Sequence, residues 1–127
     1  MYRVEDLFKK HEIPLSLSLV AGSDGLNRQI TVPEAHRPGL SLSGFLQGHA
    51  KKRLLVFGKV EINYLKNLSS NECLERLTPI LTKDTPAVIV ARQLKPVDEL
   101  ITLCNQKKIP LFRTPIATMN LLSKLTH

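Results

Sequence analysis

The second half of the chain, from Arg53 onward, contains three short apolar runs separated by longer segments with helical spacing. The runs are residues 54–58 (LLVFG), 86–91 (PAVIVA) and 109–113 (IPLFR). Continuous apolar runs of this length are typical of parallel strands that are buried on both faces. Because parallel strands are joined by crossovers, usually helices, this order predicts an α/β fold with right-handed connections.

Two helices are predicted between the first two runs. One covers residues 61–68, and the next begins after Ser69, which has capping-box spacing to Glu72, and ends at Pro79. The apolar stripes of these helices are Tyr64, Leu65 and Leu68, and then Cys73, Leu74 and Leu77.

Two further helices are predicted around the last run. Pro96 opens the first of them, whose acidic first turn and basic last turn match the helix dipole. Its apolar stripe is Val97, Leu100, Ile101 and Cys104. Thr114 and Pro115 have the residue types of an N-cap and a first helical position, and predict a closing helix through Leu125.

The first half of the chain predicts a short N-terminal helix and edge strands. A helix over residues 3–12 follows from apolar positions at helical spacing, which are Val4, Leu7, Phe8 and His11. Alternating leucine and serine over residues 14–22 predicts a strand with one solvated face, followed by a turn and a short strand near Ile30. Residues 33–48 carry proline and glycine and are predicted to be mostly loop.

Gly39 and Gly44, in the stretch PGLSLSGFL (residues 38–46), have the spacing of a phosphate-binding P-loop. A P-loop needs lysine and then serine or threonine directly after the second glycine, because these side chains contact the phosphates and the magnesium ion. Here Phe45 and Leu46 follow, so the stretch is not a P-loop. Its alternating leucines and serines predict a short half-buried strand or a turn.

The composition fits one folded domain over residues 1–127, with 43% hydrophobic residues. No apolar run approaches the roughly 18 residues of a membrane span, and the N-terminus lacks the apolar core of a signal peptide. Cys73 and Cys104 lie on separate predicted helices without CxxC spacing, which indicates buried, reduced thiols. We therefore expect a cytoplasmic protein with no membrane partner.

The net charge of +7 raises the question of nucleic-acid binding. The basic residues are scattered in short groups and only 5% of residues are aromatic, so the distribution argues against a nucleic-acid interface. After Glu99 no acidic residue follows. This acid-free end could face an acidic partner or an acidic continuation of the chain, or could simply serve solubility.

No set of residues in the sequence indicates catalysis or metal binding. None of the four histidines has metal-ligand spacing to another histidine, a cysteine or a carboxylate. His11 completes the apolar stripe of the first helix, which favours a role at the helix boundary. We expect no catalytic residue, no metal site and no cofactor in this chain.

Cations follow each predicted core strand. Lys59 comes after the first run, Arg92 after the second and Arg113 at the end of the third, while Arg37 comes from a loop that could fold over the same edge. Ligands of open parallel sheets gather at the carboxyl ends of the strands. These four residues therefore predict an anion site for phosphate or carboxylate. The alternative is that they pair with neighbours such as Glu61 or point into water.

The order of several segments resembles the N-terminal domain of bacterial HPr kinase/phosphorylase. The segments are VAG, GLNRQI, RPGLSLSGF, RLLVFGKVEINYL, AVIVARQLKPVDEL and IPLFRT, in the same order along nearly the whole chain. This resemblance implies a fold similar to the UDP-sugar-binding domain of the Mur ligases, with a small, mostly parallel sheet flanked by helices.

The resemblance also implies a parent enzyme that phosphorylates a serine of the phosphocarrier HPr with ATP or pyrophosphate. The enzyme reverses this reaction by phosphorolysis, in carbon catabolite regulation. The P-loop, ATP and Mg²⁺ are implied for a C-terminal kinase domain that these 127 residues do not contain. The implied partners are that kinase domain in the same polypeptide, HPr through the parent enzyme, and further copies in a homohexamer.

Two functions therefore remain open. The chain is either an assembly or regulatory domain of such a kinase, or a stand-alone sensor that binds a phosphorylated or anionic metabolite at the strand ends. They differ in whether the native gene continues beyond the codon for His127. A nucleic-acid-binding module is a third, less supported, alternative.

Overall fold

The structure is a computed structural model that describes residues 2–32, 35–43 and 52–117. In the first half of the chain the elements are α1 (Val4–His11), β1 (Ser18–Ala21), the 3₁₀ turn η1 (Ser23–Gly25), β2 (Ala35–His36) and α2 (Gly39–Leu42). In the second half they are β3 (Leu54–Phe57), α3 (Lys59–Lys66), α4 (Ser70–Leu77), β4 (Val88–Val90), α5 (Asp98–Lys107) and β5 (Leu111–Arg113).

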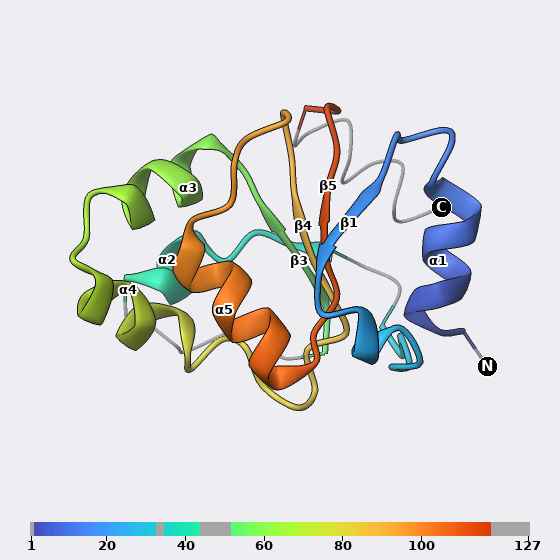
Figure 1. Cartoon of the computed structure of the whole chain (residues 1–127), viewed down its shortest axis with the longest axis horizontal. Helices are drawn as coiled ribbons and strands as arrows, with labels where there is room; N and C mark the ends of the chain where they lie inside the picture. Colours follow the sequence, from blue (N-terminus) through green and yellow to red (C-terminus); the bar gives the residue numbers. More distant parts are fainter. Residues whose placement is uncertain (1, 33–34, 44–51, 118–127) are drawn as a thin grey trace.

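The described strands form one sheet in the order β1-β5-β4-β3-β2 (Figure 1). Strands β2 to β5 are parallel to their neighbours, and only β1 is antiparallel, on the outer side of β5. The prediction of an α/β fold with a small, mostly parallel sheet and edge strands is confirmed. The predicted core runs correspond to β3, β4 and β5.

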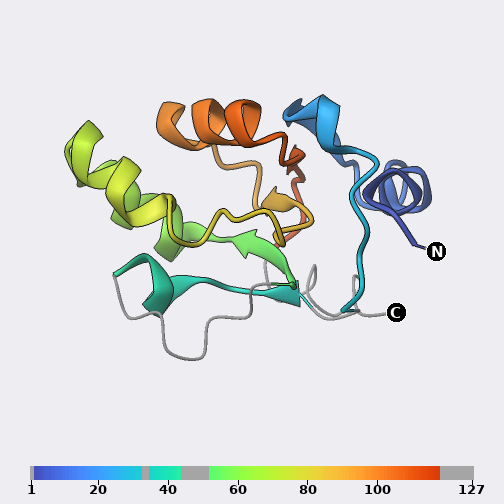
Figure 2. The same cartoon turned by 90° about the horizontal axis from the view of Figure 1, so that it is seen from below.

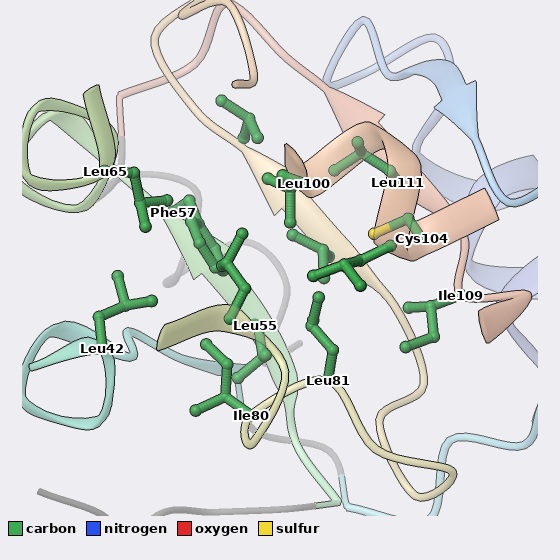
Figure 3. Packing of buried hydrophobic residues seen from close by; sticks show 14 of the residues in the cluster. Leu42, Leu55, Phe57, Leu65, Ile80, Leu81, Leu100, Cys104, Ile109 and Leu111 are labelled. Carbon is green, nitrogen blue, oxygen red and sulfur yellow. The ribbon is translucent and has the colours of Figure 1, made fainter. Parts of the chain in front are cut away.

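The sheet is covered on both faces. Figure 2 shows α1 on one side of the sheet and α3, α4 and α5 on the other. Successive strand residues point to opposite faces, so Leu55, Phe57 and Leu111 pack under the larger helical layer (Figure 3), whereas Val56 and Phe112 pack toward α1. This two-sided burial is why the core strands are continuously apolar in sequence.

Residues before the first turn determine where the helices of the second half begin. Helix α3 begins two residues earlier than predicted, because the carboxylate of Glu61 accepts a hydrogen bond from the backbone N–H of Gly58 at 2.9 Å. Helix α4 is capped by Ser69, whose Oγ accepts from the N–H of Glu72 at 3.2 Å, as predicted. Helix α5 begins after Val97, so Pro96 precedes the helix instead of opening it.

The first half differs more from the predictions. Helix α1 is confirmed, but the strand predicted over 14–22 is only Ser18–Ala21, and a turn with Ser16 at φ 50° precedes it. Leu15, in the turn, and Leu17, directly after it, are buried as they would be in a strand, which explains the misleading alternation. Near Ile30 the structure has only an isolated bridge between Arg3 and Gln29.

The two stretches 38–43 and 114–117 also differ from their predictions. The first, predicted as a short half-buried strand or a turn, contains the short helix α2, closed by a hydrogen bond from the Leu42 N–H to the Pro38 carbonyl at 2.9 Å. The last described residues, 115–117, form a bend, so a helix does not begin at Pro115. The rest of the predicted closing helix, through Leu125, and Gly44 lie outside the described residues.

Candidate functional site

Four parallel strands bring the predicted cations to one edge of the sheet. The register aligns Phe57 of β3 with Val90 of β4, and Val90 with Arg113 of β5. Arg37 directly follows β2, while Lys59 and Arg92 come two residues after the last residues of β3 and β4. The carboxyl edge thus carries one cation per strand, with neighbouring strands about 4.8 Å apart.

Arg37 is held in an ion pair. Its Nη2 donates to Glu61 Oε1 at 2.9 Å, and the Glu61 side chain is only 2% exposed. The same carboxylate oxygen accepts from the Gly58 N–H, so the pair joins the end of β2 to the start of α3. The Nε atom of Arg37 is buried without a hydrogen-bond partner among the described residues. For Arg37 the structure therefore shows the second alternative of the sequence analysis, pairing with Glu61.

Arg113 stabilises the loop after β4. Its Nε donates to the Leu94 carbonyl at 2.9 Å and its Nη2 to the Gln93 carbonyl at 2.6 Å. In this loop Arg92 and Gln93 have φ values of 58° and 56°, in the left-handed region that costs non-glycine residues about 1–2 kcal/mol each. Arg113 holds this strained pair in place.

Of the four cations, Lys59 and Arg92 have exposed side chains, while Arg37 and Arg113 are half-buried and engaged as described. The Arg92 backbone is anchored by a hydrogen bond from its N–H to the Ile116 carbonyl at 2.9 Å. An anion at this edge would therefore meet two available cations, with Arg113 as fixed charge behind them, while the charge of Arg37 is balanced by Glu61.

Arg28 is a central side chain that sequence reasoning missed. Its guanidinium donates to carbonyl oxygens in two other segments of the chain. The acceptors are Lys108 (2.8 Å), Lys107 (2.8 Å), Thr85 (2.7 Å), Lys83 (2.9 Å) and Thr82 (3.4 Å). Burial lowers the pKa of Arg28, and the nearby Cys104 and Asp84 partly oppose this shift. No local pattern could reveal this role, because the acceptors lie 54 to 80 residues away in the sequence.

Two glycines allow the segment before Arg28 to approach the end of α5 closely. A Cβ atom at Gly22 would lie 1.9 Å from the Ile109 carbonyl oxygen, and one at Gly25 would lie 1.9 Å from the Lys108 oxygen. Gly22 also has φ 70°, and its N–H donates to Asn105 Oδ1 at 2.8 Å. Side chains at these two positions are incompatible with the observed packing.

The groups that sequence reasoning considered for redox or metal chemistry are structural. Cys73 and Cys104 are free and buried, and burial raises the pKa of the former to about 11 and of the latter to about 12. His11 is buried at the end of α1, and burial lowers its pKa. Within the described ranges no three histidine, cysteine or acidic side chains come together as metal ligands, and none of the helices there has the length and apolarity to cross a membrane.

The geometry defines a small α/β domain whose mostly parallel sheet carries cations at its carboxyl edge. Residues 2–127 match the family described as "HPr Serine kinase N terminus". The chain belongs to this family of HPr serine kinase N-terminal domains, which confirms the resemblance found in the sequence.

The curated relatives are much longer proteins. The HPr kinase/phosphorylase of Shouchella clausii is 34% identical over 122 residues, covering 96% of this chain and 38% of that protein. That of Bacillus licheniformis is 34% identical over 125 residues, covering 98% and 39%, and that of Bacillus subtilis is 32% identical over 112 residues, covering 88% and 36%. The chain thus spans less than two fifths of the length of these relatives.

A solved structure shares the fold. It contains the CBS and DRTGG domains of the regulatory region of a Clostridium perfringens pyrophosphatase, complexed with the activator diadenosine tetraphosphate. The TM-score is 0.58 at 16% sequence identity, over 91% of this chain and 43% of that one.

Proposed function

We propose that this chain is the N-terminal, non-catalytic domain of a bifunctional HPr kinase/phosphorylase, with an assembly or regulatory role. The parent enzyme phosphorylates a serine of HPr with ATP or pyrophosphate and removes the phosphate by phosphorolysis. The observation that carries the proposal is the match of 96–98% of this chain to less than two fifths of such enzymes.

The residues agree with a non-catalytic role. The glycine pair at 39 and 44 lacks the lysine and hydroxyl of a P-loop. In the proposed parent enzyme, ATP and Mg²⁺ are bound by a C-terminal kinase domain of the same polypeptide. That domain is the first partner, HPr is a partner of the parent enzyme, and the full-length protein forms a homo-oligomer in the cytoplasm. Coupling between an effector and the kinase needs only about 1–3 kcal/mol.

The experiment begins with the source transcript beyond the codon for His127. We expect it to continue for a domain's length and to encode G-x-x-x-x-G-K-[ST]. The whole enzyme is then compared with a variant that lacks residues 1–127, by phosphorylation of HPr and by native mass. Loss of assembly or of effector response, with catalysis retained, supports the proposal, whereas a stop codon directly after His127 contradicts it.

A second candidate is a sensor of a phosphorylated or anionic metabolite at the carboxyl edge, with Arg37, Lys59, Arg92 and Arg113 as its cations. The observation that favours it is the placement of one cation behind each parallel strand, where ligands of such sheets bind. The pyrophosphatase regulatory region, similar in fold, is complexed with a tetraphosphate activator, which is an analogy of fold alone.

A further inference from the structure

A polar hollow lies at the opposite, amino edge of the sheet. It has a volume of about 330 Å³. One wall is formed by Arg28, Gln29 and Thr31. Residues 83–86, just before β4, form another wall, and Lys52, just before β3, forms a third. The hollow is therefore separated from the carboxyl-edge cations by the length of the core strands.

The walls of the hollow carry an excess of positive charge. Arg28, Lys52 and Lys83 face it with a single carboxylate, that of Asp84. Lys52 and Lys83 are exposed, so their ammonium groups can turn toward a bound molecule. An anion entering this space meets three cations and one acid.

The charge of Arg28 is solvated by dipoles but is not neutralised. All its hydrogen-bond acceptors in the described part of the chain are backbone carbonyls. Among the described residues, the ion pair with a nitrogen–oxygen distance below 4.0 Å is that of Arg37 and Glu61, and Arg28 has no carboxylate at such a distance. Carbonyl oxygens satisfy the guanidinium N–H groups but carry no net charge, and partial burial limits compensation by water.

We propose that this hollow binds a small phosphate-bearing molecule, contacted by the ammonium groups of Lys52 and Lys83, with Arg28 as fixed positive charge behind them. A carboxylate is the poorer fit, because the guanidinium fork that would grip it in two places already serves backbone carbonyls. Lysine binds phosphate as a point charge and needs no such geometry. The volume suits a small metabolite.

The site has a structural consequence for the loops that form it. Lys52 leads into β3 and Lys83 into β4, while Arg28 already ties the segment after η1 to the loop before β4. A phosphate between the two lysines adds the segment before β3 to this arrangement.

The test uses inorganic phosphate, titrated at constant ionic strength against the ¹⁵N-labelled 127-residue chain. Amide shifts are expected in residues 28–31 and 83–85. The variant Lys52→Gln/Lys83→Gln is expected to bind phosphate about ten- to hundredfold more weakly, since it loses two charge-assisted contacts. Arg28 is left intact because its replacement would disturb the loops themselves.

Two control variants remove similar charge elsewhere. Lys66→Gln/Lys95→Gln alters two exposed lysines beside another hollow, of about 350 Å³, and Lys59→Gln/Arg92→Gln alters the carboxyl edge. Both are expected to keep the phosphate-dependent amide shifts at the hollow, with the same midpoint as in the parent chain. Equal weakening of these shifts in all three variants, their loss only in the carboxyl-edge variant, or their absence from the parent chain would overturn the proposal. Binding of duplex DNA without binding of inorganic phosphate would overturn it as well.

Discussion

Arg28 donates a hydrogen bond from Nε to the carbonyl oxygen of Lys108, 80 residues further along the chain, at 2.8 Å. This contact and its companions hold together the segment after η1, the loop before β4 and the end of α5. The amino edge of the sheet is thus organised by one guanidinium.

Replacing Arg28 by methionine is expected to lower the free energy of unfolding by about 2–4 kcal/mol, because several partly buried carbonyls lose their donor. Urea unfolding followed by circular dichroism measures this. The matched control is Arg76→Met, which removes a single exposed bond to the Ser43 carbonyl at 3.3 Å and should cost less than about 0.5 kcal/mol. Equal losses in the two variants would contradict the organising role of Arg28.

The close contact at Gly22 makes a second prediction. Gly22→Ala is expected to destabilise the fold by at least about 3 kcal/mol, since the added methyl meets the Ile109 carbonyl and the backbone has φ 70°. Gly39→Ala is the control, because the nearest atom to its methyl, Glu61 Oε2, would be 3.6 Å away. Its effect should stay within about 0.5 kcal/mol. Thermal melting of the two variants side by side gives the comparison, and a tolerated alanine at 22 would refute the packing.

The carboxyl edge is tested by ligand-dependent melting. If the edge is an anion site, pyrophosphate or a sugar phosphate at ten times its Kd raises the Tm by about 5 °C, from linkage and the size of the chain. Arg92→Ala, made in the Lys52→Gln/Lys83→Gln chain so that the amino-edge hollow does not contribute, should abolish the shift, because this cation is exposed at the strained loop. Lys95→Ala should leave it unchanged. The absence of any shift in the unmodified chain at millimolar ligand would end the hypothesis.

The buried thiols make a prediction for alkaline pH. Burial raises the pKa of Cys73 to about 11 and of Cys104 to about 12, while thiols of the unfolded chain ionise near pH 8.5. The unfolded state therefore releases protons first, and the stability that the neutral thiols contribute is lost as pH rises from about 8.5 toward 12. Cys73→Ala/Cys104→Ala should show a shallower decline of unfolding free energy over this range.

The same thiols give a direct chemical readout. At pH 8 neither cysteine of the native chain should react with a thiol-specific disulfide reagent, because both are buried and protonated. Both should react within minutes in guanidinium. Rapid reaction of either thiol under native conditions would show that it is accessible.

The core could be predicted from sequence because its burial is two-sided. Strands β3 and β4 are continuously apolar, and β5 is apolar up to Arg113. The capping residue Ser69 and the dipole pattern of α5 mark their helices locally. Helix boundaries moved by two residues at α3 and α5, since Gly58 and Val97 are the residues that cap them. Local sequence signals of this kind can be recognised without knowledge of the fold.

The rest depended on distant contacts. The alternation at Leu15 and Leu17 is compatible with a strand or a turn, and only packing against the sheet distinguishes them. The placement of four cations at one edge followed from the parallel topology. Which side chains are already engaged could be seen only in the structure, where Arg37 pairs with Glu61 and Arg113 donates to two carbonyls. The role of Arg28 and the amino-edge hollow have no local signature at all.

The antiparallel pairing of β1 with β5 has a consequence for synthesis of the protein. Ser18 lies opposite Arg113, and the Thr114 hydroxyl donates to the carbonyl of Leu15, 99 residues earlier. The first strand therefore has no neighbour in the sheet until β5 has left the ribosome, and contacts of such long sequence separation form late and slowly. A nascent chain that stalls before β5 lacks Phe112, the ring partner of Phe8 in α1, so part of the apolar face of α1 stays uncovered until β5 is added.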